Sequence, residues 1–314
     1  MVRSRLLPML TRRERRKEMS GSRLNISLDS PAMILGPHDA SQTIALGDHA
    51  EDVLNSIALN HNASKVAWTS DEGNVGVLDL VTLKSTRMRV KHANVRSLYR
   101  AMASEELTLT TDMWEHRPGE LVSGGYDCAL LHFDTSLGSL LSRFDVSAAV
   151  PPESGVSLSP PFILSTALSP AGILAAGTAD GRILLGTAGE KLVAKKGKGG
   201  RRSRKWEGLK EDGMRIIKAA EGPIVAMTFV GTGVLLSCTL LGSLMLHRIV
   251  RPATDENGDE SVELAKGWSK ETCGIAKVNA IAFVPATEGG KIKVAVGGVG
   301  KNGKGIAELL LCEI

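Results

Sequence analysis

The chain has 314 residues, of which 43% are hydrophobic and 4% aromatic, and its formal net charge is +4. This length allows one large domain with a substantial core, and no apolar run approaches the ~18 residues of a membrane-spanning helix. Seven Lys/Arg and two acids lie in residues 1–20, and eight Lys/Arg and no acid lie in residues 191–205. The rest of the chain is therefore acidic, which argues against a folded body that is a nucleic-acid platform.

Residues 1–20 are predicted to be a basic disordered tail. A dense Arg/Lys cluster occupies residues 12–17, and like charges disfavour packing. A mitochondrial presequence is the alternative, because residues 1–13 lack acids, but Glu14 and Glu18 weigh against it. Residues 21–314 are expected to form one domain with a basic insertion at 191–205.

Short apolar segments separated by turn residues recur along that domain. Leu24–Leu28, with Asp29 after it, predicts the third strand of a blade, and Thr43–Leu46 predicts its fourth. Five nearly complete cycles follow, and their strands are aliphatic or β-branched, which favours an all-β fold. The further expected strands are Leu54–Leu59, Lys65–Thr69, Val75–Asp79, Thr86–Val90, Val95–Leu98, Leu121–Ser123, Ala129–Asp134, Leu140–Phe144, Ile163–Leu168, Ile173–Ala176, Ile183–Leu185, Ile224–Phe229, Val234–Cys238, Leu244–His247, Val278–Phe283, Ile292–Val296 and Ile306–Leu311.

The stretch Glu120–Asp134 shows the cycle most clearly. A strand leads into the turn Gly124-Gly125-Tyr126-Asp127, where glycine is expected to supply backbone angles that other residues resist. A second strand then closes on Phe133-Asp134, and this order is typical of the middle of a propeller blade. The cycles exceed the ~40–45 residues of this repeat class. Insertions are expected to account for the excess, at residues 100–119, 146–160, 187–212 and 250–274.

These features resemble degenerate WD40 repeats. The marker pairs are Leu78-Asp79 and Phe133-Asp134, and the order of features resembles the WD repeat-containing protein 53 family. The runs that carry this resemblance are Leu121-Val122-Ser123-Gly124-Gly125 with Asp127, Gly177-Thr178-Ala179-Asp180-Gly181-Arg182, and Lys277-Val278-Asn279. The resemblance implies seven blades, whereas about five blades and a partial N-terminal blade are recognisable. We therefore expect an incomplete seven-blade ring, shortened at the N-terminus and open between its first and last sheets.

The resemblance implies a non-enzymatic scaffold that binds other proteins through its propeller faces, in the cytoplasm, the nucleus or both. It further implies a WD-repeat adaptor that serves as a substrate receptor of a cullin-4 ubiquitin ligase. Such receptors carry Trp-Asp-x-Arg, but here Pro31, Val81 and Ser136 stand at the Arg position. The alternative function is an RNA- or ribosome-associated factor that uses the basic segments. No cofactor, membrane or small-molecule substrate is expected.

The basic insertion is the sharpest surface feature of the sequence. Glycines and like charges disfavour a packed element there, and Trp206 supplies a single aromatic at its edge. A nuclear-import signal, a phosphate-backbone contact and a solvated linker within a blade remain open as interpretations. The candidate residues are Lys195, Lys196, Lys198, Arg201, Arg202, Arg204 and Lys205.

Other motifs favour structural roles. Gly298–Lys304 matches the spacing of a phosphate-binding loop, but Gly305 replaces the Ser/Thr, and the nine residues after it leave no room for a helix plus a parallel sheet. A long mobile turn between the second and third strands of the last blade is therefore expected. Residues 255–260 lack the calcium-loop pattern, and no His, Cys and acid set has metal or nucleophile spacing. His49 and His92 are expected to be structural, and Asp127 and Asp180 to stabilise turns. The widely spaced cysteines are expected to be reduced core or strand residues: Cys128, Cys238, Cys273 and Cys312.

Overall fold

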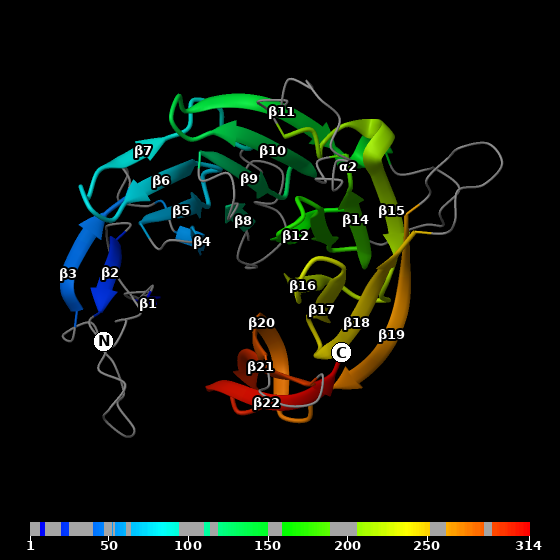
Figure 1. Cartoon of the computed structure of the whole chain (residues 1–314). Helices are drawn as coiled ribbons and strands as arrows, with labels where there is room; N and C mark the ends of the chain where they lie inside the picture. The colour runs from blue at the N-terminus through cyan, green and yellow to red at the C-terminus, as the bar shows by residue number, and fades with distance from the viewer. Residues whose placement is uncertain are drawn as a thin grey trace.

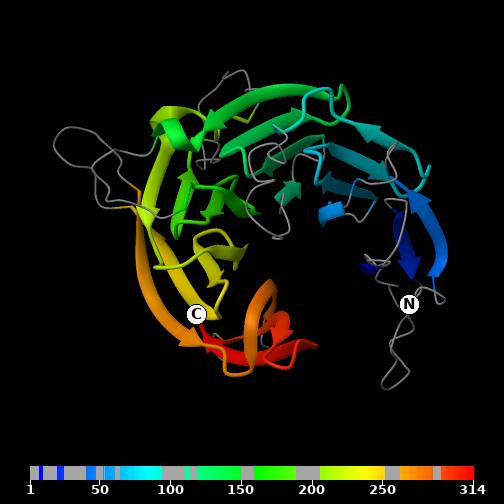
Figure 2. The same ribbon diagram turned by 180° about the vertical axis from the view of Figure 1, so that it is seen from behind.

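The computed structural model describes the chain as six antiparallel β-sheets. The described residues are 7–9, 20–24, 40–46, 52, 54–60, 64–93, 110–113, 119–149, 159–188, 206–251, 262–285 and 291–314. The sheets follow one another around an arc, as Figure 1 shows from one side and Figure 2 from the other. Five of them are propeller blades in a WD40-like arrangement, and the sixth is an N-terminal sheet. The predicted all-β propeller is thus confirmed.

The N-terminal sheet and the first two blades occupy the first half of the arc. The N-terminal sheet contains β1 (Leu7–Met9), β2 (Ser20–Leu24) and β3 (Ala40–Ala45). Blade 1 contains β4 (Leu54–Leu59), β5 (Lys65–Ser70), β6 (Val75–Asp79) and β7 (Ser85–Arg87). Blade 2 contains β8 (Thr110–Met113), β9 (Glu120–Gly124), β10 (Ala129–Asp134) and β11 (Ser139–Asp145). Within each sheet consecutive strands are neighbours.

Three further blades complete the arc, after the short helix α2 (Val146–Ala149). Blade 3 contains β12 (Ile163–Leu168), β13 (Leu174–Thr178), β14 (Arg182–Gly186) and β15 (Met214–Lys218). Blade 4 contains β16 (Ile224–Phe229), β17 (Val234–Thr239), β18 (Ser243–Val250) and β19 (Glu263–Glu271). Blade 5 has three strands among the described residues, β20 (Ile275–Pro285), β21 (Lys291–Gly300) and β22 (Gly305–Glu313).

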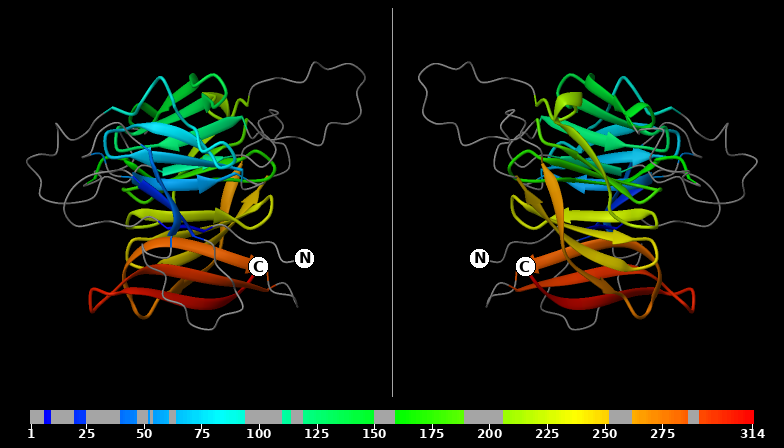
Figure 3. Two further views of the ribbon diagram at one scale, coloured as in Figure 1. Left: turned by 90° about the vertical axis from the view of Figure 1, so that its left-hand side faces the viewer. Right: turned by 90° about the vertical axis from the view of Figure 1, so that its right-hand side faces the viewer.

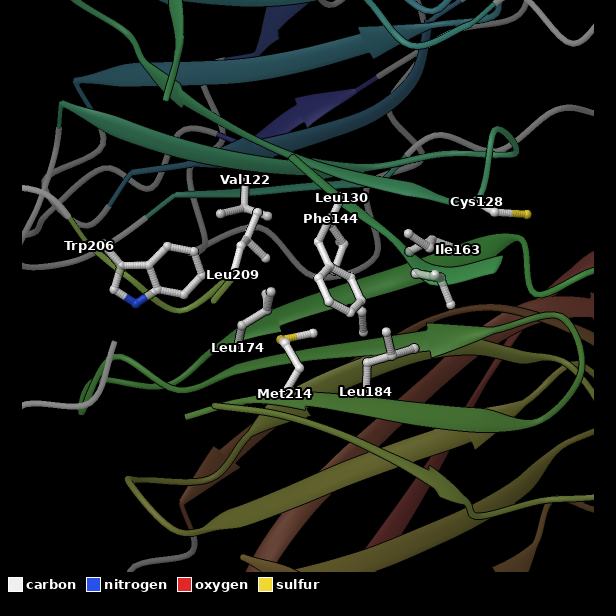
Figure 4. Close-up of a cluster of buried hydrophobic side chains, with 12 residues drawn as sticks. Val122, Cys128, Leu130, Phe144, Ile163, Leu174, Leu184, Trp206, Leu209 and Met214 are labelled. Atoms are coloured by element: carbon white, nitrogen blue, oxygen red, sulfur yellow. The ribbon is translucent and has the colours of Figure 1, made fainter. Parts of the chain in front are cut away.

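The core is divided among the junctions between neighbouring sheets. The first strands of blades 1 to 5 contact one another in sequence, so the sheets converge toward the centre of the arc. A separate apolar cluster fills each junction between successive sheets. Figure 4 shows the cluster between blades 2 and 3, where Leu130 and Phe144 meet Leu174 and Leu184. Middle strands are buried on both faces, which explains why they are continuously apolar instead of alternating.

Five strands have the bounds that the sequence predicts, and three strands of the blades were not predicted at all. β4, β6, β10, β12 and β16 have the predicted bounds. However, β8 and β19 lie within the ranges 100–119 and 250–274, which the sequence assigned to insertions, and β15 was not predicted. The predicted strand Val95–Leu98 lies outside the described residues. β19 is charged and largely exposed, so it lacks the apolar pattern that identifies a strand.

The turn between β9 and β10 corrects a prediction about glycine. Neither Gly124 nor Gly125 has a positive φ angle; the left-handed residue is Cys128, with φ of 55°. Gly124 is needed for a different reason, because a Cβ there would lie 2.4 Å from Ile163 Cγ2. This glycine therefore allows blade 3 to approach blade 2 closely instead of bending the chain.

The arc is open between its two end sheets. No backbone ladder among the described residues joins β1–β3 to β20–β22, and Figure 1 places these sheets at opposite ends of the arc. This agrees with the predicted incomplete ring. The segment expected to be a disordered tail, residues 1–20, contributes β1 and the first residue of β2, and its other residues lie outside the described part.

Candidate functional site

A buried polar cluster links blade 1 to blade 2. His92, in the connection after β7, has Nδ1 2.8 Å from Asp127 Oδ1 and Nε2 2.8 Å from Ser123 Oγ. The second carboxylate oxygen of Asp127 accepts the backbone N–H of Ala93. The order Asp–His–Ser is that of a hydrolase triad, in which histidine takes the proton of the serine nucleophile.

Burial assigns this cluster a structural role. The exposed fraction is 1% for His92 and 0% for Ser123, which lies in the second strand of blade 2. A nucleophile must reach its substrate, and the Ser123 hydroxyl is enclosed by packed strands. The cluster instead satisfies buried polar groups while fastening one blade to the next. The predicted structural role of His92 and the turn-stabilising role of Asp127 are confirmed, whereas His49 lies outside the described residues.

The charge on Asp127 is also set by this cluster. Burial alone pushes the pKa of the carboxyl group upward, but the hydrogen bond and charge interaction with His92, together with backbone N–H donors, outweigh it. The pKa of Asp127 therefore lies below its ordinary value, and the residue is a carboxylate at neutral pH. Ser123 could not be singled out in advance, because it is only one hydroxyl in an otherwise aliphatic strand.

Two more buried histidines lie on third strands. His132 on β10 places Nε2 2.9 Å from Glu120 Oε2, and its ring packs edge-on against Trp206 with centroids 5.1 Å apart. His247 on β18 places Nε2 2.9 Å from Ser237 Oγ. Burial and the charge of Lys266 lower the pKa of His247 to about 4, so this imidazole is neutral at physiological pH.

The turn of blade 3 contains the second predicted turn-stabilising aspartate. Asp180 lies next to Gly181 and accepts a hydrogen bond from the Thr178 hydroxyl. Its carboxylate lies 3.2 Å from the Arg182 guanidinium, and both side chains are largely buried. Thr178 Oγ1 also accepts the backbone N–H of Arg182. The prediction for Asp180 is thus confirmed, since Oδ1 accepts the Thr178 hydroxyl and Oδ2 forms the ion pair with Arg182 within the turn.

The glycine-rich sequence near the C-terminus is a tight hairpin turn, and no phosphate cradle forms there. β21 ends at Gly300 and β22 begins at Gly305. Gly303, with φ of 75°, donates its N–H to Gly300 O, and Gly300 donates to Lys304 O. The side chain of Asn302 accepts the N–H of Lys304. Because the turn uses these N–H groups itself, they are not free to bind phosphate. The expected turn between the second and third strands of the last blade is confirmed, and it is shorter than expected.

The basic insertion starts and ends at one place on blade 3. Its predicted residues, Lys195 to Lys205, lie outside the described part of the chain. At its start, Thr187 donates its backbone N–H to Gly213 O over 2.9 Å. At its end, Trp206 is 2% exposed and donates its Nε1–H to Gly172 O over 2.9 Å. Figure 4 places Trp206 beside Leu209 at the junction of blades 2 and 3.

Trp206 is therefore an anchor, and its ring is not available for stacking on nucleic-acid bases. The sequence interpretation, which treated it as an aromatic at the edge of the basic segment, missed this role. A tryptophan that follows directly after a run of charges was the available signal, because such a residue is rarely left in solvent.

The cysteines and the charged groups offer no metal centre within the described residues. No group of three or more His, Cys, Asp and Glu side chains there converges on one point. All four cysteines are free: Cys128, Cys238 and Cys312 are buried, and Cys273 is exposed. The described residues also include no helix long and apolar enough to cross a membrane.

Comparisons with known proteins identify a fold and no family. No family model and no curated protein matches the sequence. Among solved structures 1360 chains are similar, so the fold is widely shared. One is a chain in a crystal structure of the mitotic checkpoint complex, with a TM-score of 0.56 and 12% identity over 98% of this chain and 76% of that chain. At this identity the likeness shows a β-propeller fold.

Proposed function

We propose that this chain is a non-enzymatic scaffold, an adaptor that binds another protein through one face of its propeller. The observation that carries the proposal is the exposure of Val81 and Leu137, at 82% and 63%. Each lies in the turn between the third and fourth strands of its blade, and the two blades are neighbours. Large aliphatic side chains in paired turns are a surface suited to protein contact.

The two turns are held by side-chain hydrogen bonds and are linked to each other, which favours binding with little loss of loop entropy. Asp79 Oδ1 accepts the backbone N–H groups of Val81 and Thr82, and Asp134 Oδ1 does the same for the residues of the second turn. The N–H of Arg89, just after β7, donates to Gly138 O over 2.8 Å and so connects the two blades. We refer to Val81 and Leu137 as the turn surface.

A finer version of the proposal concerns the class of adaptor. The resemblance to the WD repeat-containing protein 53 family favours a substrate receptor of a cullin-4 ubiquitin ligase. Val81 and Ser136 stand two residues after Asp79 and Asp134, where that class has arginine. The position is at the surface, so a Val81→Arg variant that gains binding to the ligase adaptor would support this version, and one that gains nothing would remove its main support.

An RNA- or ribosome-associated role is the second candidate. Its support is the charge of residues 191–205, whose ends are fixed on blade 3 by Thr187 and Trp206. With Trp206 buried, such binding would depend on phosphate contacts alone and would weaken steeply as salt rises. The same segment would serve as a nuclear-import signal under a scaffold function.

An affinity purification from cell extract tests both candidates. We expect the bound proteins to survive nuclease treatment and deletion of residues 191–205. They should be lost from the double variant Val81→Asp/Leu137→Asp, because a charge in each turn opposes apolar contact. Leu241→Asp is the matched control, since Leu241 is 74% exposed in a turn between second and third strands, on the opposite face.

Two outcomes would reject the scaffold proposal. Loss of all partners after nuclease, or after the deletion, would favour the nucleic-acid role. Equal loss in Leu241→Asp would show that the turn surface has no special part in binding.

A further inference from the structure

Blade 5 has one apolar face that no described strand covers. On β20 this face carries Ala280, Ala282 and Val284, and on β22 it carries Leu309 and Leu311, which are 77% and 54% exposed. The middle strand, β21, contributes Lys293, Ala295 and Gly297, which pair directly with these residues across the sheet. Figure 3 (left) shows the three strands side by side in the lower part of the molecule. We refer to these eight residues as the end face.

The composition of the end face is that of a buried surface. A sheet face in contact with water normally alternates with polar residues, whereas a sheet covered on both sides is apolar throughout. The opposite side of blade 5, with Val294, Val296 and Leu310, packs on blade 4. Among its eight residues only Lys293 is charged, and the charged pair Lys291 and Glu313 bounds the face in the next row toward the chain end. The apolar part matches a covered layer, although it is exposed in this structure.

The N-terminal sheet of the same molecule does not cover the end face. Figure 1 places it at the other end of the arc, and Ile44 of β3 packs against blade 1 beside Trp68. Bringing that sheet to blade 5 would change the angle at every junction between them. These junctions are close-packed clusters, and close-packed cores resist such deformation.

We propose that the end face pairs with the end face of a second copy, which forms a two-fold dimer. Side-chain size changes across the face, from alanine on β20 to leucine on β22. Consider a two-fold axis that lies between the two facing sheets, directly over β21 and parallel to it. This axis places β22 of each copy over β20 of the other, so Leu309 faces Ala282 and Leu311 faces Val284. Large residues then meet smaller ones at both places, as a self-complementary interface requires.

Area and charge both predict that this dimer is weak. Three strands about 4.8 Å apart and about seven residues long cover on the order of 350 Å². Stable dimers bury roughly 800 Å² per copy, so we expect a dissociation constant on the order of 10 to 100 μM. Lys293 lies near the axis and approaches Lys293 of the other copy, and this repulsion lowers the affinity further.

Sedimentation velocity of the full chain tests the proposal. Protein concentrations from about 1 to about 200 μM span the expected dissociation constant of the dimer. We expect the weight-average mass to rise toward that of a dimer with concentration. Leu309→Lys should abolish the rise because it adds charge to the apolar centre. Lys293→Ala should shift the rise to a several-fold lower concentration because it removes the repulsion. Both residues are exposed in the monomer, so neither change should unfold it.

Leu241→Lys is the control, since Leu241 is 74% exposed but lies on blade 4 outside the end face. The proposal is overturned if the wild type stays monomeric throughout the range, if Leu241→Lys weakens association as much as Leu309→Lys, or if Lys293→Ala weakens it. A monomeric wild type whose melting temperature falls in Leu309→Lys would show that the face is covered within the molecule, and this also overturns the proposal.

Discussion

Single glycines in the turns between second and third strands set how closely the connection from the fourth strand to the next blade can approach. Gly181 has φ of 80°, and a Cβ there would lie 2.0 Å from Ala220 O. Gly73 and Gly242 are also left-handed, and a Cβ would meet His92 O and Thr272 Oγ1 respectively. These contacts explain why the turn residue is glycine in three blades, whereas in blade 2 the left-handed residue is Cys128.

Gly181→Ala is therefore expected to destabilise the fold more than a change in backbone angle alone would. The matched control is Gly231→Ala, since Gly231 has φ of 76° but open space around its Cβ position. The control should cost about 1 to 2 kcal/mol for the left-handed conformation, and Gly181→Ala about 1 to 3 kcal/mol more because of the clash. Urea unfolding measures the loss of unfolding free energy in both variants. Equal losses would contradict the close approach of Ala220 O to Gly181.

His247 predicts a loss of stability in mild acid. Its pKa in the folded chain is about 4, below the ordinary value of 6.5, so the unfolded chain binds the proton more tightly. The contribution to stability is present above pH 6.5 and is lost as pH falls toward 4. The loss amounts to at most roughly 3 kcal/mol, since one pKa unit corresponds to about 1.4 kcal/mol.

Urea unfolding as a function of pH checks this loss. His247→Gln should flatten the stability curve between pH 7 and pH 4, whereas Ser237→Ala, which retains the imidazole, should keep its slope. An unchanged slope in His247→Gln would mean that other groups cause the acid sensitivity.

The polar clusters show what sequence could and could not predict at this scale. His92, Asp127 and Asp180 were recognisable because each adjoins a turn or a strand start of the repeat. Ser123 was not, because its role depends on a histidine 31 residues away in the chain. A pairing between blades follows from how two sheets dock, which no local pattern encodes.

At the scale of whole strands, the apolar pattern decided what the sequence could predict. The third strands β6 and β10 have apolar residues toward both neighbouring sheets, and their bounds were predicted as observed. β8 and β19 lack an apolar pattern, so they resemble loops in composition. Long side chains of β19 nevertheless bridge to blade 5: Trp268 Nε1–H donates to Glu313 O over 2.7 Å, and Lys270 Nζ donates to Leu311 O over 2.9 Å.

Trp206 provides a prediction for the element that ends the basic insertion. Trp206→Ala should cost about 3 to 5 kcal/mol, because it empties a large site at the junction of blades 2 and 3. Trp206→Phe keeps most of the volume but leaves Gly172 O without its donor, at a cost of about 1 to 3 kcal/mol.

Trp268→Phe is the matched control, because it loses an indole hydrogen bond at an exposed place where water can substitute. It should cost less than Trp206→Phe in urea unfolding. A Trp206→Ala variant as stable as the wild type would contradict the assignment of Trp206 as an anchor.

At the scale of the molecule, the arc of sheets was predictable because the order of strand, turn and strand repeats. The open arrangement was expected from the number of recognisable cycles. The distribution of unpaired surfaces was not, because exposure depends on which sheet lies next to which. The turn surface and the end face therefore became visible only once the strands were assigned to blades.

The hydrogen bond between Thr187 and Gly213 has a consequence for how this protein can change over evolutionary time. It fixes the start of the basic insertion beside the segment that follows it, independently of what lies between. Doubling the length of a closed loop costs only about 0.6 kcal/mol in closure entropy. The segment can thus gain, lose or exchange charges with little effect on the blades. New targeting signals or binding partners can therefore evolve there without destabilising the fold.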